Sequence, residues 1–364
     1  MSDFIRKPQH VYQDPLAEIW IHCAERIGFK VVRSKEAYAS TDGRGTLLIA
    51  TEDHLDPDDH LGQMIFHELC HALVEGDEGE SRVDWGLDNT QMGNPWREHA
   101  ALRLQAYLAE RWGLRDFMAP TTDFRVTFWS NLPLDPFEGS VDAGGNLEKS
   151  VLAAKKAFYR AEGPRFKAPL EDALKATALI GTLARGIGSP LSQGSDPSMG
   201  LRPLWETVKD PLPLHPLGHD VVRDSLFDNT CGHCSWHFFS RGHLRCRHQP
   251  RVKLSPLAPA CRRFESQETL DCKTCGACCR EAYDSVEISR RDPIHRTHPE
   301  WVEILETHHK LKRSGGRCIA LEGGNGSEDH YQCRIYPERP KTCRDFSLGG
   351  SNCLEARRRV GISV

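Results

Sequence analysis

Hydrophobic residues recur with helical spacing along the N-terminal half of the chain. In residues 14–27 this spacing follows an Asp-Pro start, which is typical of a helix N-terminus. The same spacing predicts two long helices over 58–76 and 94–113, and each ends at a glycine. Two further helices are expected over 147–163 and 169–186. Helices therefore account for most of the regular structure expected in this half.

Short apolar runs predict two strands between the first two helices. They are FKVV at 29–32 and GTLLIAT at 45–51, and the turn sequence TDGRG leads into the second. Residues 186–218 are rich in glycine, proline and serine and are expected to form a linker. Helices combined with a small sheet predict an α+β fold, with a helical middle segment and cysteine-rich modules after it.

The cysteines are distributed very unevenly along the chain. Of the 14 cysteines, only Cys23 and Cys70 precede residue 231. A chain of 364 residues is long enough for several folding units. We therefore expect four domains: a histidine-containing domain at 1–119, a helical extension and linker at 120–225, a four-cysteine module at 226–266 and a cysteine-cluster domain at 267–364.

The net charge of −4 hides an asymmetry between two parts of the chain. Residues 231–364 contain 23 Lys and Arg against 16 Asp and Glu, whereas residues 1–230 contain 24 against 35. A basic C-terminal part could attract nucleic acid or an acidic partner. The simpler interpretation is that these cations offset the negative charge of cysteine thiolates. A nucleic-acid partner is therefore left open but is not favoured.

Membrane association is not expected, because no apolar run approaches the roughly 18 residues that span a bilayer. The first residues lack the basic and then apolar plan of a signal peptide, so we expect a cytoplasmic protein. Thiols stay reduced in the cytoplasm, and closely spaced cysteines there indicate metal binding before disulfides. The sequence gives no indication of an oligomeric state.

The helix expected over 58–76 carries a cluster of side chains that can bind a metal. His67 and His71 are one helical turn apart, so they share one face and can reach a single Zn²⁺. Glu68 lies to one side of them, where it can act on a water as a general base. Cys70 lies on the other side and is expected to pack as a small hydrophobic residue.

A catalytic zinc site needs a third protein ligand and an open fourth position. Glu98 lies at the start of the next long helix, and HExxH followed by such a glutamate resembles the gluzincin metallopeptidases, in particular compact ImmA/IrrE-type proteins. The alternative is Asp77, at the spacing of the third ligand in metzincins. That motif needs a glycine where this chain has Val74, because the backbone turns sharply there. We therefore expect Glu98 as the third ligand, and His99 beside it is a candidate for contact with substrate or with a ligand.

The resemblance implies a compact gluzincin-like unit of helices plus a small mixed sheet. Zn²⁺ would be held by His67, His71 and Glu98, and Glu68 would deprotonate a water that attacks a peptide carbonyl. The implied partner is a protein or peptide substrate. By analogy, the strand at 45–51 would be the edge strand that pairs with an extended substrate.

The first cysteine constellation has one close pair and two more distant members. Four cysteines suffice for a tetrahedral Zn²⁺ or for one [4Fe–4S] cluster. The spacing is strong evidence for a metal site and weak evidence for the identity of the metal. The expected ligands are Cys231, Cys234, Cys246 and Cys261.

The second constellation is denser and begins with CKTCGACC. Its cysteines are Cys272, Cys275, Cys278, Cys279, Cys318, Cys333, Cys343 and Cys353. Together with the block CRIYPERPKTCRDF they resemble the YkgJ-type CxxCxxCC proteins, a family associated with chelation of zinc or iron. The adjacent Cys278 and Cys279 point different ways, so they serve different metal atoms, or one serves a metal and the other the core. Eight thiolates could hold two Zn²⁺, or one iron–sulfur cluster plus a structural site, with Arg280, Arg339 and Arg344 offsetting their charge.

Three functions are compatible with these motifs. The main hypothesis is a cytoplasmic zinc-dependent metallopeptidase whose cysteine modules, with bound Zn²⁺, iron or [4Fe–4S], regulate or target it. The alternative is an iron–sulfur oxidoreductase or metal-handling protein whose chemistry lies in the cysteine clusters. A second alternative is a binding protein without catalysis, in which the metals only stabilise the fold.

Overall fold

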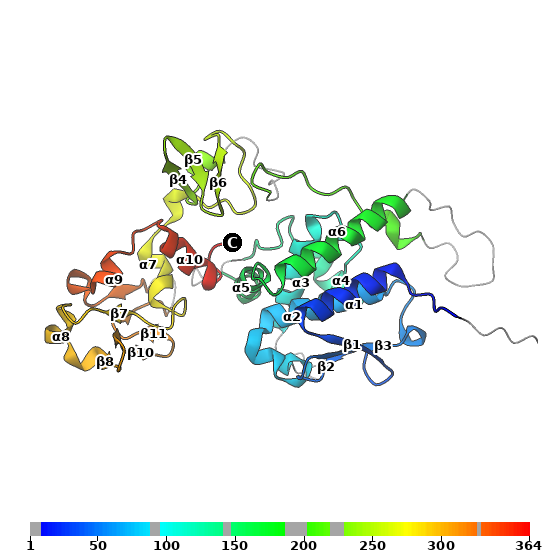
Figure 1. Ribbon diagram of the computed structural model, residues 1–364, viewed down its shortest axis with the longest axis horizontal. Helices are drawn as coiled ribbons and strands as arrows, with labels where there is room; N and C mark the ends of the chain where they lie inside the picture. The colour runs from blue at the N-terminus through cyan, green and yellow to red at the C-terminus, as the bar shows by residue number, and fades with distance from the viewer. Residues whose placement is uncertain (1–8, 88–94, 141–146, 186–201, 219–228, 326–328) are drawn as a thin grey trace, which may run out of the picture. The chain divides into compact units, whose positions relative to one another are not determined.

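A computed structural model describes residues 9–87, 95–140, 147–185, 202–218, 229–325 and 329–364 (Figure 1). The chain divides into two compact units: unit 1 comprises Met1–Leu134 and Arg160–Pro211, and unit 2 comprises Asp135–Tyr159 and Leu212–Val364. Both combine helices with small sheets, so the fold class is α+β, as predicted. The expected linker at 186–218 is described only over 202–218. The finer division into four domains stays a prediction.

Unit 1 contains a mixed sheet of three strands in the order β1-β3-β2. Strand β1 (Lys30–Ser34) runs parallel to β3 (Thr46–Ala50), and β2 (Ala39–Thr41) pairs with β3 in the antiparallel sense. The strand expected at the edge of the sheet is therefore the central one. Its Leu47 and Ile49 are fully buried, as is typical of a strand covered by neighbours. The true edge strand, β2, is too short and too polar to reveal itself by a hydrophobic pattern.

Four helices build the core of unit 1 around this sheet. Helix α1 (Pro15–Ile27) contacts β1, and α2 (Leu61–Glu80) contacts β2 and β3. Helix α3 (Pro95–Glu110) packs on α2, and α6 (Lys167–Ala184) packs on α1, while α4 (Phe124–Thr127) is a single turn (Figure 1). At the centre of this arrangement is Trp20, whose buried Nε1 donates to Thr177 Oγ1 at 3.0 Å. The interaction ties α1 to α6 across a long stretch of sequence.

Helix α2 is kinked at Gly76, where the sequence pattern predicted that it would end. Gly76 has φ 66° and ψ −167°, a conformation that is open only to glycine, and the helix resumes beyond it to Glu80. The kink leaves carbonyls without helical partners. Arg160 in α5 (Lys149–Ala161) compensates, because its Nη1 donates to the Leu73 and Val74 carbonyls at 2.6 and 2.9 Å. A Cβ atom at Gly76 would meet this guanidinium at 3.0 Å.

Unit 2 begins with most of α5 and contains both cysteine constellations. The four-cysteine module is an antiparallel sheet of β4 (His237–Ser240), β5 (His243–Cys246) and β6 (Gln249–Leu254). The remainder consists of short elements and one longer helix at the C-terminal end: α7 (Cys272–Cys275), β7 (Glu287–Ile288), α8 (Ile294–Thr297), β8 (Val302–Ile304), β9 (His309–Leu311), β10 (Arg313–Ser314), β11 (Arg317–Cys318), β12 (Leu321–Glu322), β13 (Gln332–Cys333), α9 (Lys341–Arg344) and α10 (Ser351–Arg359).

The interior of unit 2 is split among small hydrophobic clusters. Among the described residues of this unit, three such clusters contain cysteine side chains. Elements this short bury little apolar surface. The cysteine side chains therefore form part of the small hydrophobic clusters of this unit. Among the helices that the structure describes, none is both long enough and apolar enough to cross a membrane.

We predict that Thr177→Val lowers the free energy of unfolding by about 1–3 kcal/mol, because the Trp20 indole N–H is then buried without an acceptor. Thr182→Val is the matched control: Thr182 lies on the same helix and bonds only its own helix carbonyl, as the structure describes it. Urea unfolding followed by tryptophan fluorescence measures both. Equal effects of the two substitutions would contradict the role given to the Trp20 contact.

Candidate functional site

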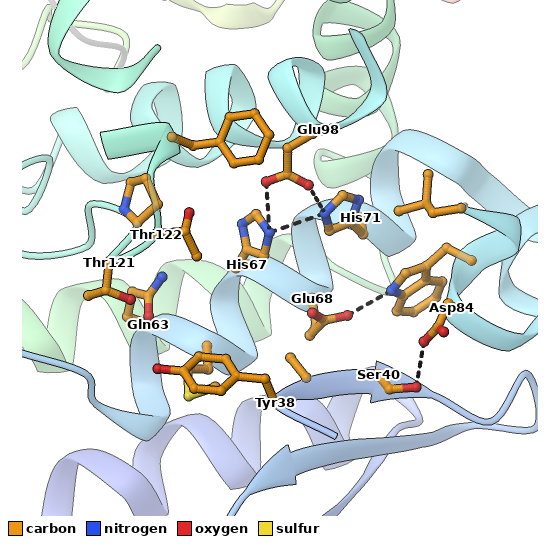
Figure 2. A pocket seen from close by; sticks show the side chains of 16 residues that line it. Tyr38, Ser40, Gln63, His67, Glu68, His71, Asp84, Glu98, Thr121 and Thr122 are labelled. Carbon is orange, nitrogen blue, oxygen red and sulfur yellow. Dashed lines mark hydrogen bonds and ion pairs between the residues drawn. The ribbon is translucent and has the colours of Figure 1, made fainter. Parts of the chain in front are cut away.

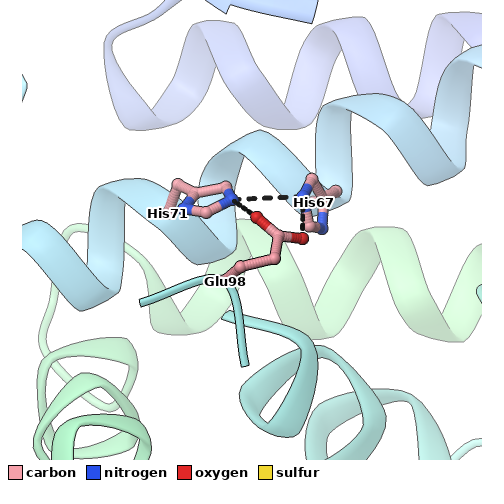
Figure 3. A group of neighbouring side chains, drawn as sticks. All are labelled: His67, His71 and Glu98. Carbon is pink, nitrogen blue, oxygen red and sulfur yellow. Dashed lines mark hydrogen bonds and ion pairs between the residues drawn. The ribbon is translucent and has the colours of Figure 1, made fainter. Parts of the chain in front are cut away.

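Three side chains from α2 and α3 converge on one point (Figures 2 and 3). Glu98 lies in the first turn of α3, and its carboxylate oxygens are 3.3 Å from His67 Nε2 and 3.0 Å from His71 Nε2. The two Nε2 atoms are 3.1 Å apart. Among the described residues, this is the one group of three or more potential ligands whose donor atoms all lie within 4.8 Å of one another. The donor set of two imidazoles and a carboxylate fits the ligand set of a catalytic zinc.

A buried glutamine fixes the orientation of His67. Gln105 is fully buried and its Nε2 donates to the Met118 carbonyl at 2.5 Å, so its Oε1 faces His67 Nδ1 at 2.8 Å. Nδ1 then carries a proton, so the proton that leaves on metal binding comes from Nε2, the nitrogen that faces the other donors. His71 Nδ1 is also buried, and it has no hydrogen-bond partner among the described residues.

Burial and charge act against each other within this group. Burial lowers the pKa of His67, but the Glu98 carboxylate more than offsets it and raises that pKa to about 9. For Glu98 itself, burial favours the neutral acid, whereas the two imidazoles beside it hold its pKa well below the usual range. The Glu98 carboxylate thus favours a positive charge on the His67 ring beside it. A divalent cation can take the place of that proton.

Glu68 is held beside the cluster by a tryptophan (Figure 2). The side chain is 6% exposed, and its Oε2 accepts a hydrogen bond from Trp85 Nε1 at 2.7 Å. Trp85 and the preceding Asp84 have φ of 58° and 49°, in the left-handed region that side chains rarely adopt. The Asp84 carboxylate accepts from the Ser40 hydroxyl, which connects this turn to the edge strand β2. The turn therefore aims an indole N–H at the carboxylate.

A pocket of about 260 Å³ opens over these groups. The edge strand contributes Ala39 and Ser40, and Thr121 and Thr122 lie in its wall. The sequence reasoning missed Trp85, Ser40 and Gln105. For Gln105 a signal existed, because it follows Glu98 by two helical turns and so lies on the same face of α3. The other two depend on tertiary folding and carry no local motif.

Three other residues that the sequence singled out lie elsewhere. The alternative ligand Asp77 is exposed, just beyond the kink at Gly76, and is not in the donor group. Cys70 is fully buried in the core, and burial raises the pKa of its thiol well above the usual range. His99 stacks on Phe128 with ring centroids 3.9 Å apart and does not line the pocket, so its expected contact with substrate or a ligand stays a prediction.

The four-cysteine module presents its thiols to one small cavity. Cys231, Cys234, Cys246 and Cys261 are 7–8% exposed and together line a space of about 10 Å³. Burial raises the pKa of Cys261 to about 12, so its thiolate needs a cation beside it. His215, from the stretch expected as a linker, is 2% exposed and its Nε2 is 3.4 Å from Cys231 Sγ. No local motif connects this histidine with the module.

None of the chain's 14 cysteines, all in the described residues, forms a disulfide. Around the CxxCxxCC motif, the interaction with Cys279 lowers the pKa of Cys278 to about 7, and Arg339 acts in the same direction. Of the other two arginines expected to offset thiolate charge, Arg280 pairs with Glu281 and Arg344 donates to the Arg339 carbonyl. A thiol that is ionised near neutral pH is ready to bind a metal.

Comparisons with known proteins concern the C-terminal part. A family model described as "CxxCxxCC: Putative zinc- or iron-chelating domain" matches residues 271–357. The chain is 33% identical over 103 residues to the "Uncharacterized protein YkgJ" of Escherichia coli O157:H7, which is 25% of this chain and 93% of that protein. No solved structure matches. The expected metal-chelating, cysteine-rich character of this part is supported, whereas the metallopeptidase resemblance of the N-terminal part gains no support from these matches.

We predict that Glu98→Gln reduces the metal content of the full chain by one zinc, because an amide cannot replace the carboxylate between two imidazoles. Asp77→Asn is the control and should retain all the zinc, because its side chain is exposed and outside the donor group. Mass spectrometry of zinc-loaded protein after desalting measures both. Loss of zinc from the Asp77 variant alone would show that the alternative ligand is the correct one.

Proposed function

Because this chain belongs to the CxxCxxCC family, we propose that it is a metalloprotein of two parts, in which unit 2 chelates zinc or iron and unit 1 is a zinc-dependent hydrolase. The family supports the first part. The second part is supported by one observation, the convergence of His67, His71 and Glu98 in a pocket that also contains Glu68. That combination supplies a ligand set and a separate base.

The proposed chemistry assigns a role to each side chain of the pocket. His67, His71 and Glu98 would hold the zinc, which when bound supplies a Lewis acid that polarises a carbonyl and acidifies a water. Glu68 accepts the proton of the attacking water on its Oε1, because Oε2 is engaged by Trp85 Nε1. Gln105 keeps the His67 ring in the orientation and tautomer that leave Nε2 free.

The edge strand supports a peptide as the substrate class. Among the described strands, β2 pairs with β3 and is the edge of the sheet, and its Ala39 and Ser40 line the pocket. An extended peptide can add to such an edge through its main chain, which would bring a carbonyl towards the donor group. We therefore propose a peptidase activity together with an extended peptide as the class of substrate.

A second function is favoured by the family match itself. In this alternative the chemistry lies in unit 2, as metal handling or as iron–sulfur redox chemistry, and unit 1 serves as a binding scaffold. The structural feature that favours it is the pair Cys278 and Cys279, whose Sγ atoms are 4.0 Å apart, because the pairing lowers the pKa of Cys278 and a thiolate is the form that binds a metal.

We predict that Glu68→Gln lowers the hydrolysis of a fluorogenic peptide library by about 10²–10⁴-fold while the bound zinc stays unchanged, because the amide cannot take the proton. The matched control is Glu78→Gln, the same substitution at an exposed position of α2 beyond the kink. It should leave the rate unchanged. A Glu68→Gln variant that hydrolyses the peptides at the wild-type rate would contradict the role of Glu68 as the general base.

Metal analysis of anaerobically purified full-length protein separates the two functions. We predict zinc as the main metal and no acid-labile sulfide, because the proposed hydrolase needs none and four thiolates form a complete zinc site. Sulfide in stoichiometric amount with iron, together with unchanged cellular function of the Glu68→Gln variant, would favour the second function instead.

A further inference from the structure

Cys278 and Cys279 are adjacent in the chain but their side chains diverge. Gly276 turns the backbone with φ 56°, and Ala277–Cys279 follow as one turn of 3₁₀-helix. Successive residues of a 3₁₀-helix point about 120° apart. The two Sγ atoms are 4.0 Å apart, a separation at which one metal could still bind both. Among the described residues, no three cysteine Sγ atoms all lie within 4.8 Å of one another. The grouping of the thiols is therefore inferred from the surroundings of each side chain.

These two neighbours pack against different hydrophobic clusters. Cys278 packs against a cluster that contains Cys275 together with Ala356 and Val360 of the C-terminal helix region. Cys279 packs against a separate cluster that contains Ile294 and Leu311. The other cysteines in or against that second cluster are Cys318, Cys333 and Cys343. Packing alone thus separates most of the cysteines into two groups, with the division between residues 278 and 279.

The first group is completed by α7 and α10. Cys272 and Cys275 are three residues apart on α7 and so lie on one face of it. Cys353 lies on α10, which packs against the turn Ala277–Cys279. Electrostatic interactions link Cys272 to Cys275, Cys278 and Cys353. Cys353 in turn interacts with Cys275 and Cys278.

The second group is built from β11, β13 and α9. Cys318 and Cys333 come from two neighbouring hairpins, and Cys343 comes from α9. Cys343 interacts electrostatically with both Cys318 and Cys333, and Cys279 interacts with Cys318 and Cys343. Cys278 is also a main electrostatic partner of Cys318, Cys333 and Cys343, so its assignment to the first group rests on its packing. Cys272, Cys275 and Cys353 are not among the main partners of these thiols.

Each group has cations of its own. Arg357 interacts with Cys275 and with Cys353 of the first group. In the second group, Arg313 interacts with Cys318 and Arg334 with Cys333. A divalent metal held by four thiolates leaves a net charge of −2, which buried sites must balance. Arginines beside each group can balance this charge, and Arg339 is shared, because it interacts with Cys278 of the first group and with Cys333 and Cys343 of the second.

We propose that the eight cysteines form two adjacent four-thiolate metal sites, with Cys278 in the first and Cys279 in the second. The first site consists of Cys272, Cys275, Cys278 and Cys353, and the second consists of Cys279, Cys318, Cys333 and Cys343. The inference rests on the proposed chelation by unit 2 and adds the assignment of each cysteine to a site. Each site takes one zinc or iron ion, and binding releases the thiol protons to solvent.

The test replaces one ligand of each site in the full chain loaded with zinc. Cys353→Ser should lose one zinc and make Cys272, Cys275 and Cys278 reactive towards N-ethylmaleimide, while the second site stays protected. Cys343→Ser should lose one zinc and expose Cys279, Cys318 and Cys333, while the first site stays protected. Tandem mass spectrometry of the peptide with the two adjacent cysteines shows which of them is labelled.

Controls keep the result interpretable. Cys23→Ala, at a buried cysteine of unit 1, should change neither the zinc content nor the labelling. Cys272→Ser and Cys318→Ser provide a second variant for each site and should give the same two patterns. Continued protection of Cys231 and Cys261 in every variant shows that unit 2 remains folded.

Two outcomes overturn the inference in different ways. Labelling of all seven remaining thiols in both variants would show a single site of eight cysteines, and exposure of Cys278 in both would show a bridging thiolate. In either case zinc in the wild-type protein would leave the proposed chelation standing. Wild-type protein that binds no zinc and protects no thiol would instead remove the chelation itself, and with it the two sites.

Discussion

The candidate site of unit 1 depends on a carboxylate placed between two imidazoles at the contact of α2 and α3. Glu98 is only partly exposed and His71 is buried, so solvent screens the interaction between them less than it would at the surface. Isolated, such a charge would be costly to bury, and it is stable here because opposite charge surrounds it. The packing of α3 on α2 and the position of the cluster are therefore linked: a shift of either helix would leave a buried charge unpaired.

The same constraint explains the groups around the cluster. Gln105 holds His67 through a chain of hydrogen bonds that ends at the Met118 carbonyl. On the other side, Trp85 reaches Glu68 from a turn with two left-handed residues, a conformation that costs stability. Strain of this kind persists where the surrounding structure imposes it, and its presence beside the proposed base is consistent with a site that is selected for geometry rather than for stability.

The sequence predicted those parts of the fold that depend on local periodicity. Helices α1, α3 and α5 lie within the segments expected for them, whereas α2 runs past its expected end and α6 begins two residues before its expected start. The i, i+4 spacing of His67 and His71 correctly placed both on one face of α2. The sheet was predicted incompletely, because β2 has only three residues and gained its place by pairing with β3. Without that strand, β3 was assigned to the edge. The end of α2 was misjudged because a glycine that breaks a helix and a glycine that kinks it look the same in sequence.

Unit 2 is held together in a different way, because one short helix, α10, contacts both cysteine modules and α5. Neighbouring residues of α10 have different partners. Cys353 interacts with Cys275 of α7, and Leu354 packs with the four-cysteine module. Arg357 pairs with Glu265 at the end of that module. Glu355 meets Tyr159 of α5 at 2.7 Å. A helix of nine residues is marginal by itself. Its stability must come from these contacts, so a metal bound at Cys353 would stabilise α10 and, through α10, the packing of both cysteine modules in one unit.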